Sequence, residues 1–135
     1  MNHSLQERLV RDYPFLRSTE GFECSDGWYK LLDDLCQAIQ SRLVISRNSY
    51  FRVALVKETF GRLRVEYVFG DTEISKMIEE ATKRSANVCT LCGSKGALCY
   101  RESGWVYFKT YCPTHAALYG YKEYSESTTT YMDEK

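Results

Sequence analysis

The sequence predicts an α+β fold in which a helix, a β-hairpin and a second helix precede a small cysteine-containing finger. Apolar residues recur every three or four positions over about 26–44 and again over about 72–84, which is the period of an amphipathic helix. Between these segments the period changes to two, as in half-buried strands. We therefore expect residues 1–86 to form a helix/β-hairpin/helix domain, 87–120 a finger that shares its core, and 121–135 a flexible tail.

The first half of the chain supplies two helices before the hairpin. Residues 5–16 predict a short helix that stops before Pro14, because the residue preceding a proline is pushed out of the helical region. The main helix opens near Asp26 and runs to about residue 44. Its predicted apolar face consists of Trp28, Leu31, Leu32, Leu35, Cys36, Ile39 and Leu43.

The hairpin is predicted from two alternating segments, 51–58 and 62–69, on either side of a turn at 59–61. On the second strand, one face is expected to carry Leu63, Val65, Tyr67 and Phe69, and the other Arg62, Arg64 and Glu66. A further amphipathic helix opens near Asp71, runs to about Arg84 and is expected to pack on the hairpin.

Composition and charge exclude several classes of protein. The 135 residues contain 18 Lys and Arg against 18 Asp and Glu, so the chain is neither a histone-like protein, an acidic DNA mimic nor a polybasic membrane binder. No apolar run approaches the length of a membrane helix, and residues 1–10 lack the order of a secretion signal. We expect a cytoplasmic protein.

Two ligand pairs predict a metal site, Cys89-x2-Cys92 and Cys112-x2-His115. Four thiolate and imidazole ligands in two such pairs are the set that tetrahedral Zn²⁺ prefers, and we expect bound zinc. Disulfides are disfavoured in a reducing compartment. An iron–sulfur cluster would need a fourth cysteine, such as Cys99, in place of His115.

The residues around the two pairs predict a treble-clef-like zinc finger. Gly93 suits a tight knuckle after the first pair, and Pro113 suits the first position of a helix that begins after Cys112. A hairpin of 98–100 against 105–109 would join the two pairs. Because four protein ligands leave no position for water, we expect the zinc to be structural.

The sequence offers no catalytic set. Its two histidines are His3, near the terminus, and His115, which is assigned to the metal. No phosphate-binding glycine loop or nucleophile elbow is present. The acidic pairs at 33–34 and 79–80 lie on polar helix faces, so we expect a non-enzymatic protein.

A local excess of positive charge indicates a binding surface. Positions 42–64 hold six Lys and Arg residues against Glu58 alone. The predicted partner-binding residues are Arg52, Lys57, Arg62 and Arg64, together with Trp105 in the finger. These arginines could bind phosphates or acidic proteins, or merely keep the hairpin soluble. We expect a protein partner, and nucleic-acid binding through the arginine hairpin and the finger is the alternative.

The chain resembles a family of small uncharacterised proteins common in bacteriophages and prophages. The resemblance spans most of residues 13–115 and is carried by the Asp26-Gly27-Trp28 segment, the Lys57-Glu58-Thr59-Phe60-Gly61-Arg62-Leu63-Arg64 hairpin and the two ligand pairs. Ser25 stands where glycine is frequent, and the tail after 120 extends beyond the family pattern. The resemblance implies a phage or mobile-element accessory protein that works inside a bacterial host. From its zero net charge, abundant tyrosine and lack of a catalytic set, we expect it to engage a host protein and to inhibit or redirect it.

Overall fold

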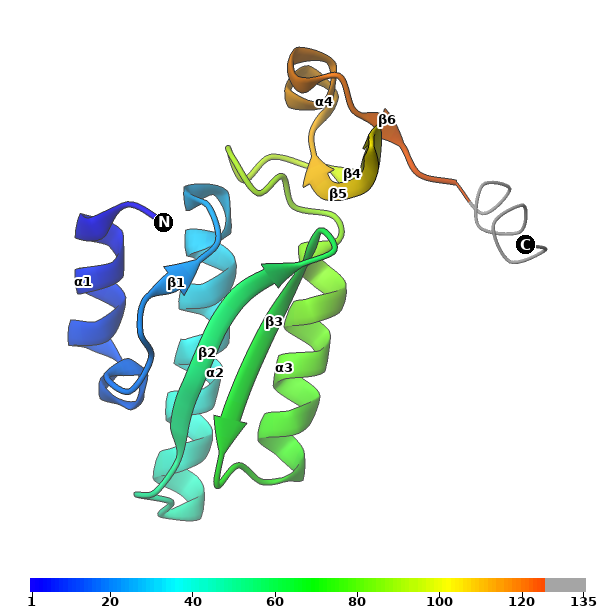
Figure 1. The fold of residues 1–135 in the computed structure, drawn as a ribbon. Coiled ribbons are helices and arrows are strands. Elements are labelled where there is room, and N and C mark those ends of the chain that lie inside the picture. The colour runs from blue at the N-terminus through cyan, green and yellow to red at the C-terminus, as the bar shows by residue number, and fades with distance from the viewer. Residues whose placement is uncertain (126–135) are drawn as a thin grey trace.

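The structure, a computed structural model, describes residues 1–125 and confirms the α+β class (Figure 1). The described helices are α1 (His3–Asp12), η1 (Pro14–Leu16), η2 (Asp26–Trp28), α2 (Tyr29–Ser46), α3 (Thr72–Ser85) and α4 (Pro113–Tyr119). The described strands are β1 (Phe22–Glu23), β2 (Arg52–Thr59), β3 (Arg62–Val68), β4 (Ala97–Ser103), β5 (Trp105–Tyr111) and β6 (Lys122–Glu123). None of these helices is both long and apolar enough to span a bilayer.

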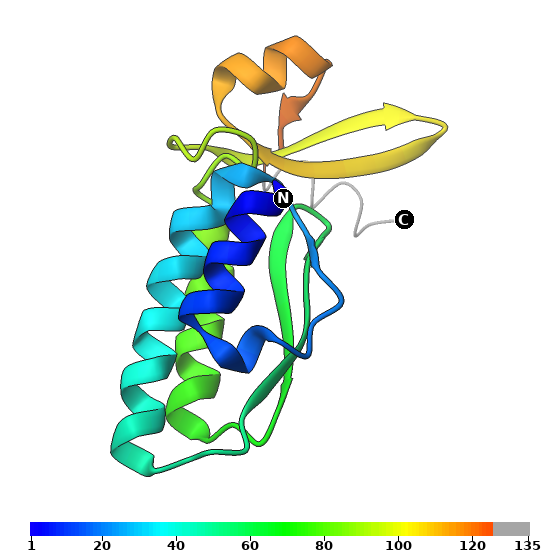
Figure 2. The same ribbon diagram turned by 90° about the vertical axis from the view of Figure 1, so that its left-hand side faces the viewer.

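The first sheet has the strand order β1-β2-β3. β1 runs parallel to β2, and β2 and β3 form the predicted antiparallel hairpin, with an irregularity in register between Val53 and Leu55. Figure 2 shows that α1, α2 and α3 lie on one side of this sheet. The other face of the hairpin carries Arg62, Arg64 and Glu66 of β3, as the alternation in the sequence predicts.

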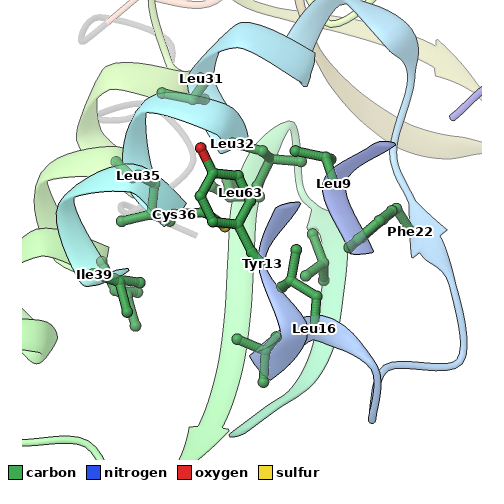
Figure 3. Close-up of a cluster of buried hydrophobic side chains, with 14 of the residues drawn as sticks. Leu9, Tyr13, Leu16, Phe22, Leu31, Leu32, Leu35, Cys36, Ile39 and Leu63 are labelled. Carbon is green, nitrogen blue, oxygen red and sulfur yellow. The ribbon is translucent and has the colours of Figure 1, made fainter. Parts of the chain in front are cut away.

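The main core lies between the three helices and the sheet (Figure 3). The predicted apolar face of α2 is buried from Leu31 to Ile39, whereas Leu43 is only partly buried; Trp28, just before the helix, is completely buried. α1 adds Leu9 to this core, and the Tyr13 hydroxyl after it donates a hydrogen bond of 2.9 Å to the carboxylate of Asp33 on α2. Burial of this side of each element is the main force that assembles the layer.

Side-chain hydrogen bonds fix where the helices begin. The Asn2 side chain accepts a 2.8 Å hydrogen bond from the amide of Ser4 at the start of α1. At the start of α3, Asp71 accepts a 2.9 Å hydrogen bond from the Ile74 amide, and its other oxygen lies 2.9 Å from Arg42 of α2. The Ile74 N–H, followed by the Arg42 guanidinium, holds the pKa of Asp71 below its usual value.

The predicted orientation of one hairpin residue, Phe69, is wrong. Phe69 was expected on the buried face with Leu63, but it is 69% exposed. β3 ends at Val68, and Phe69 has a φ of 62°, which breaks the alternation and turns its side chain away from the core. Its ring instead lies edge-on to Tyr50 on the surface.

The second sheet, with the order β5-β4-β6, lies across the end of the molecule at which the β2–β3 turn is found (Figures 1 and 2). Its buried cluster is separate from the main core and contains Cys89, Cys99, Tyr111, Cys112 and Ala116. β6 pairs with β4 inside the segment predicted as a flexible tail, so that tail does not begin at Tyr121. The rest of the predicted tail, 126–135, lies outside the described residues.

Hydrogen bonds, more than a shared core, join the second sheet and its ligand turn to the first sheet and its helices. The Gly27 amide donates to the Thr90 carbonyl at 2.8 Å, and the Trp28 indole N–H donates to the Val88 carbonyl at 2.9 Å. From the other side, the Thr110 hydroxyl donates to the Gly61 carbonyl at 2.6 Å. The finger is thus attached both to the start of α2 and to the turn of the hairpin.

Ser85→Ala is expected to destabilise the protein by about 1–3 kcal/mol, because it leaves a buried donor without an acceptor. Ser85 is completely buried, and its hydroxyl oxygen accepts a 3.0 Å hydrogen bond from the Leu63 amide. Urea unfolding measures the loss. The control is Ser41→Ala on the exposed side of α2, which should change stability by less than about 0.5 kcal/mol. Equal losses of stability in the two variants would show that the hydrogen bond between the Leu63 amide and Ser85 does not stabilise the fold.

Candidate metal centre

Four predicted ligands converge at one point of the finger. The ligand atoms of Cys89, Cys92, Cys112 and His115 all lie within 4.8 Å of one another, so this cluster could hold a metal ion. All six cysteines of the chain lie within the described residues, and none forms a disulfide. The prediction that these four residues come together is therefore confirmed, and the cluster they form could hold a metal ion.

The first ligand pair lies in a tight turn that follows α3. The Gly93 amide donates to the Cys89 carbonyl at 2.9 Å, and the Cys89 amide donates to the Ser94 carbonyl at 2.8 Å. Gly93 has a φ of 79°, a conformation that glycine adopts without a steric cost. This turn holds the two thiols on the same side of the chain.

The second pair spans the start of α4. β5 ends at Tyr111, and Cys112 is the residue that precedes the first turn of the helix. Pro113 occupies the first helical position, as predicted, and the Ala116 amide donates to the Cys112 carbonyl at 2.9 Å. His115 therefore lies within the first turn, where its ring reaches back to the Cys112 thiol.

The distances between ligand atoms suit a tetrahedral ion. The Cys92 and Cys112 sulfurs are 3.8 Å apart, and the His115 Nδ1 atom lies 3.2 Å from the Cys112 sulfur and 3.5 Å from that of Cys89. A metal about 2.3 Å from each sulfur would place two sulfurs about 3.8 Å apart in a tetrahedron. A disulfide would need about 2.05 Å, so these are separated thiols.

Local hydrogen bonds favour the ionised form of two thiols. The backbone N–H of His115 lowers the pKa of Cys112 to about 6, and the Ser94 hydroxyl, 2.9 Å from the Cys92 sulfur, lowers the pKa of Cys92. Burial raises the pKa of Cys89, and the Cys112 thiol raises the pKa of His115. Thiolate is the form in which cysteine binds a metal, so Cys112 and Cys92 are prepared for this role.

Thr90, inside the Cys89–Cys92 turn, attaches the cluster to the rest of the protein. It is 1% exposed, and its amide donates to the Thr110 carbonyl at 2.9 Å. Its hydroxyl donates at 3.2 Å to the carboxylate of Glu58, whose side chain is only 7% exposed and lies 2.7 Å from the Lys109 ammonium. Movement of the ligand turn would therefore disturb β2 and β5 as well.

The sequence did not point to these supporting residues. Thr90 and Glu58 are 32 positions apart, and no local pattern links them. Gly27 lies in the Asp26-Gly27-Trp28 segment, where the sequence predicted the start of the main helix but not a contact with the ligand turn. A Cβ atom at Gly27 would lie 2.6 Å from the carbonyl carbon and oxygen of Thr90, which explains why glycine is needed there.

The other three cysteines lie outside the cluster. Cys99 is buried on β4 beside it, and its sulfur lies 3.2 Å from the Ala97 carbonyl oxygen. Burial raises the pKa of Cys99, which disfavours the thiolate. The ligand set that an iron–sulfur cluster would need, with Cys99 in place of His115, does not come together; His115 is the fourth residue of the cluster. Cys24 and Cys36 belong to the main core.

The predicted partner-binding residues do not form one surface. Lys57 lies opposite Arg64, and Arg62 opposite Thr59, on the face of the hairpin away from the helices. Arg64 is 2.6 Å from Glu66, as the solubility interpretation anticipates, whereas Arg62 has no ion pair within residues 1–125. Arg52 lies opposite Val68 at the other end of the hairpin. Trp105 lies in the second sheet, at the tip of the β4–β5 hairpin.

Comparison with known proteins finds no relative of this chain: no family model, no curated protein and no solved structure matches it.

Proposed function

We propose that this protein is a non-enzymatic binding module, stabilised by one structural zinc ion, that engages a bacterial host protein. The donor set supports zinc, since three cysteines and one histidine form a common structural zinc site. With four protein ligands the coordination sphere is closed to water, which favours a structural role over a catalytic one. The small buried cluster of the finger also favours metal stabilisation.

The order of elements supports a treble-clef-like finger. The Cys89–Cys92 turn is followed by the β4–β5 hairpin, and the second ligand pair begins α4. A knuckle, a hairpin and a helix start around one ion is the arrangement that the ligand spacing predicts. In this role the zinc fixes the base of the hairpin and leaves its tip free.

The observation that carries the proposal is the exposed apolar tip of the β4–β5 hairpin. Trp105 is 78% exposed, and Val106 and Tyr107 beside it are also exposed. Figure 2 shows this hairpin extending beyond the helices and the first sheet. Tryptophan and tyrosine are favoured anchors of protein interfaces, and their exposure on a projecting element indicates a contact with another protein.

The backbone of β5 adds a second means of contact. The Thr110 carbonyl accepts from Thr90, so it points away from β4. Because the backbone groups of alternate residues share one edge of a strand, those of Val106 and Phe108 also point away from β4. β5 is the outer strand of its sheet within residues 1–125, so this edge can accept a strand from a partner.

Trp105→Ala is expected to abolish capture of the partner while leaving zinc content and melting temperature unchanged, because this side chain makes little contact with its own protein. The zinc-loaded protein is used to capture partners from nuclease-treated bacterial lysate, followed by mass spectrometry. The matched control is Ile45→Ala, which removes a 74% exposed apolar side chain at the end of α2. If the alanine variant at position 105 captures the same protein as fully as the control, the tip is not the binding surface.

Nucleic-acid binding is the second candidate, and the placement of cations and aromatic rings favours it. Lys57, Arg62 and Arg64 lie together on the open face of the hairpin. In the finger, the Arg101 guanidinium lies 5.1 Å from the ring centre of Tyr121 and 5.7 Å from that of Tyr107. The hairpin cations could bind phosphates, and the finger residues could stack on bases.

The double variant Arg62→Glu, Arg64→Glu distinguishes the two candidates. If nucleic acid is the ligand, the variant should weaken binding strongly, and the affinity of the natural protein should fall steeply with salt concentration. If a protein binds through the Trp105 tip, the variant should bind almost normally and salt should have a small effect. Fluorescence anisotropy with single-stranded DNA at several salt concentrations tests the first outcome, and capture of the partner from nuclease-treated lysate at the same salt concentrations tests the second.

A further inference from the structure

A hollow of about 500 Å³ lies at the end of the molecule opposite the metal cluster. It is formed where η1, the end of α2 and the start of β2 meet, and Figure 1 shows these segments far from the finger. Its lining consists of Pro14, Phe15, Arg17, Ser18, Gln40, Leu43, Asn48, Ser49, Phe51 and Arg52. Two arginines are present in this lining, and no carboxylate.

The charge around the hollow is positive and unbalanced. The two chain segments that form it, 13–19 and 40–52, contain four arginines and no aspartate or glutamate. Arg42 is neutralised by Asp71 at 2.9 Å. Arg17 and Arg52 have no ion pair within residues 1–125, in contrast to Arg64 on the same sheet, which pairs with Glu66.

The remaining groups complete a site for an oxyanion. Ser18 and Ser49 in the lining have hydroxyl groups, and the two guanidinium groups have planar pairs of N–H donors of the kind that match phosphate oxygens. The partial negative charge at the end of α2 is reduced, because the Leu43 carbonyl accepts the amides of Arg47 and Asn48. The full positive charges of Arg17 and Arg52 outweigh the remaining partial negative charge at the end of α2.

The base of the hollow is fixed by packing and hydrogen bonds. The buried rings of Phe15 and Phe51 lie edge to face with their centres 5.3 Å apart. The Asn48 side chain accepts the amides of Tyr50 and Phe51 and donates to the Phe69 carbonyl at 2.7 Å. The segments that carry the two arginines are therefore held in place before any ligand binds.

We propose that this hollow is a binding site for a phosphate-type oxyanion, held between Arg17 and Arg52. The site is separate from the metal cluster and from the Trp105 tip, and it gives Arg52 a role distinct from that of Lys57, Arg62 and Arg64. Its ligand is a phosphate monoester or inorganic phosphate, because both present the same dianionic group to the two guanidinium groups.

The test is a titration of the zinc-loaded full chain with inorganic phosphate at constant ionic strength, followed by backbone amide NMR. The proposal predicts saturable shifts confined to the amides of 17–18 and 48–52. Arg17→Ala and Arg52→Ala should each weaken phosphate binding about tenfold, since each removes a charge-assisted hydrogen-bonding group. Both side chains are exposed, so the variants should keep the melting temperature of the natural protein.

Arg47→Asn is the matched control. Arg47 lies close to the hollow in sequence but does not line it, and asparagine tolerates its left-handed backbone conformation, with a φ of 56°. This variant removes the same charge and should change phosphate affinity by less than about twofold. Shifts that stay linear and spread over the surface, or equal losses in all three variants, would overturn the proposal.

Discussion

Cys92→Ser is expected to lose the zinc ion that we propose for this cluster and to unfold the finger. Structural zinc in small domains contributes about 10–16 kcal/mol of apparent binding free energy, which is comparable with the whole stability of a domain of this size. Cys92 is the informative ligand because it is exposed, whereas Cys89 and Cys112 are buried. Replacing Cys92 removes a ligand with little loss of packing. A large loss of stability in this variant would therefore result from the loss of the metal.

The zinc content of this variant is measured by native mass spectrometry, and its folding by amide hydrogen exchange. Cys99→Ala is the control, since Cys99 is buried beside the cluster but is not part of it. The control should keep one zinc ion and lose only the packing of a small side chain. A Cys92→Ser protein with full zinc content and an unchanged melting temperature would contradict the ligand assignment.

Gly27→Ala is expected to destabilise the protein by about 3 kcal/mol or more and to weaken zinc binding at the same time. The added Cβ would lie 2.6 Å from the carbonyl carbon and oxygen of Thr90 and closer still to the carbonyl oxygen of Cys89. Both neighbours are backbone atoms of the ligand turn, so no side-chain rotation relieves the overlap. The start of α2 or the turn must move, and the 2.8 Å hydrogen bond from Gly27 to Thr90 is strained or lost.

Gly104→Ala is the matched control. It lies at the tip of the β4–β5 hairpin with a φ of 78°, and a Cβ there would meet no atom within 4 Å. It should cost only the backbone strain of about 1 kcal/mol. Urea unfolding and zinc competition measure both variants. If the two glycine variants lose similar stability and zinc affinity is unchanged, the contact between the start of α2 and the ligand turn does not influence zinc binding.

Local patterns in the sequence predicted the main helices, the hairpins and the clustering of the four Cys and His residues. The face of α2 that contains Leu31, Leu35 and Ile39 is buried, because its helical period extends over five turns of chain. The four ligands converge because each pair is set by local geometry, a glycine turn in one case and a helix start in the other. Such features depend on residues close in the sequence, and one chain is enough to recognise them.

Contacts between distant segments were not predictable from the same patterns. β1 and β6 are two residues long and exist only because a neighbouring strand pairs with them. Glu58 was counted as the single acid in a basic segment, yet it is buried against Thr90 and Lys109. Phe69 follows the alternation of its strand in the sequence but lies beyond the end of the strand. In each case tertiary packing, which sequence periodicity does not describe, decides the outcome.

The central claim is that one zinc ion at Cys89, Cys92, Cys112 and His115 holds the ligand turn against the start of α2. The most direct test is amide hydrogen exchange of the protein with zinc and after removal of zinc by a chelator. The account predicts one zinc ion per chain, and strong protection of the Gly27, Cys89 and Thr90 amides, which is lost when the metal is removed. Unchanged protection of these amides in the metal-free protein would contradict it.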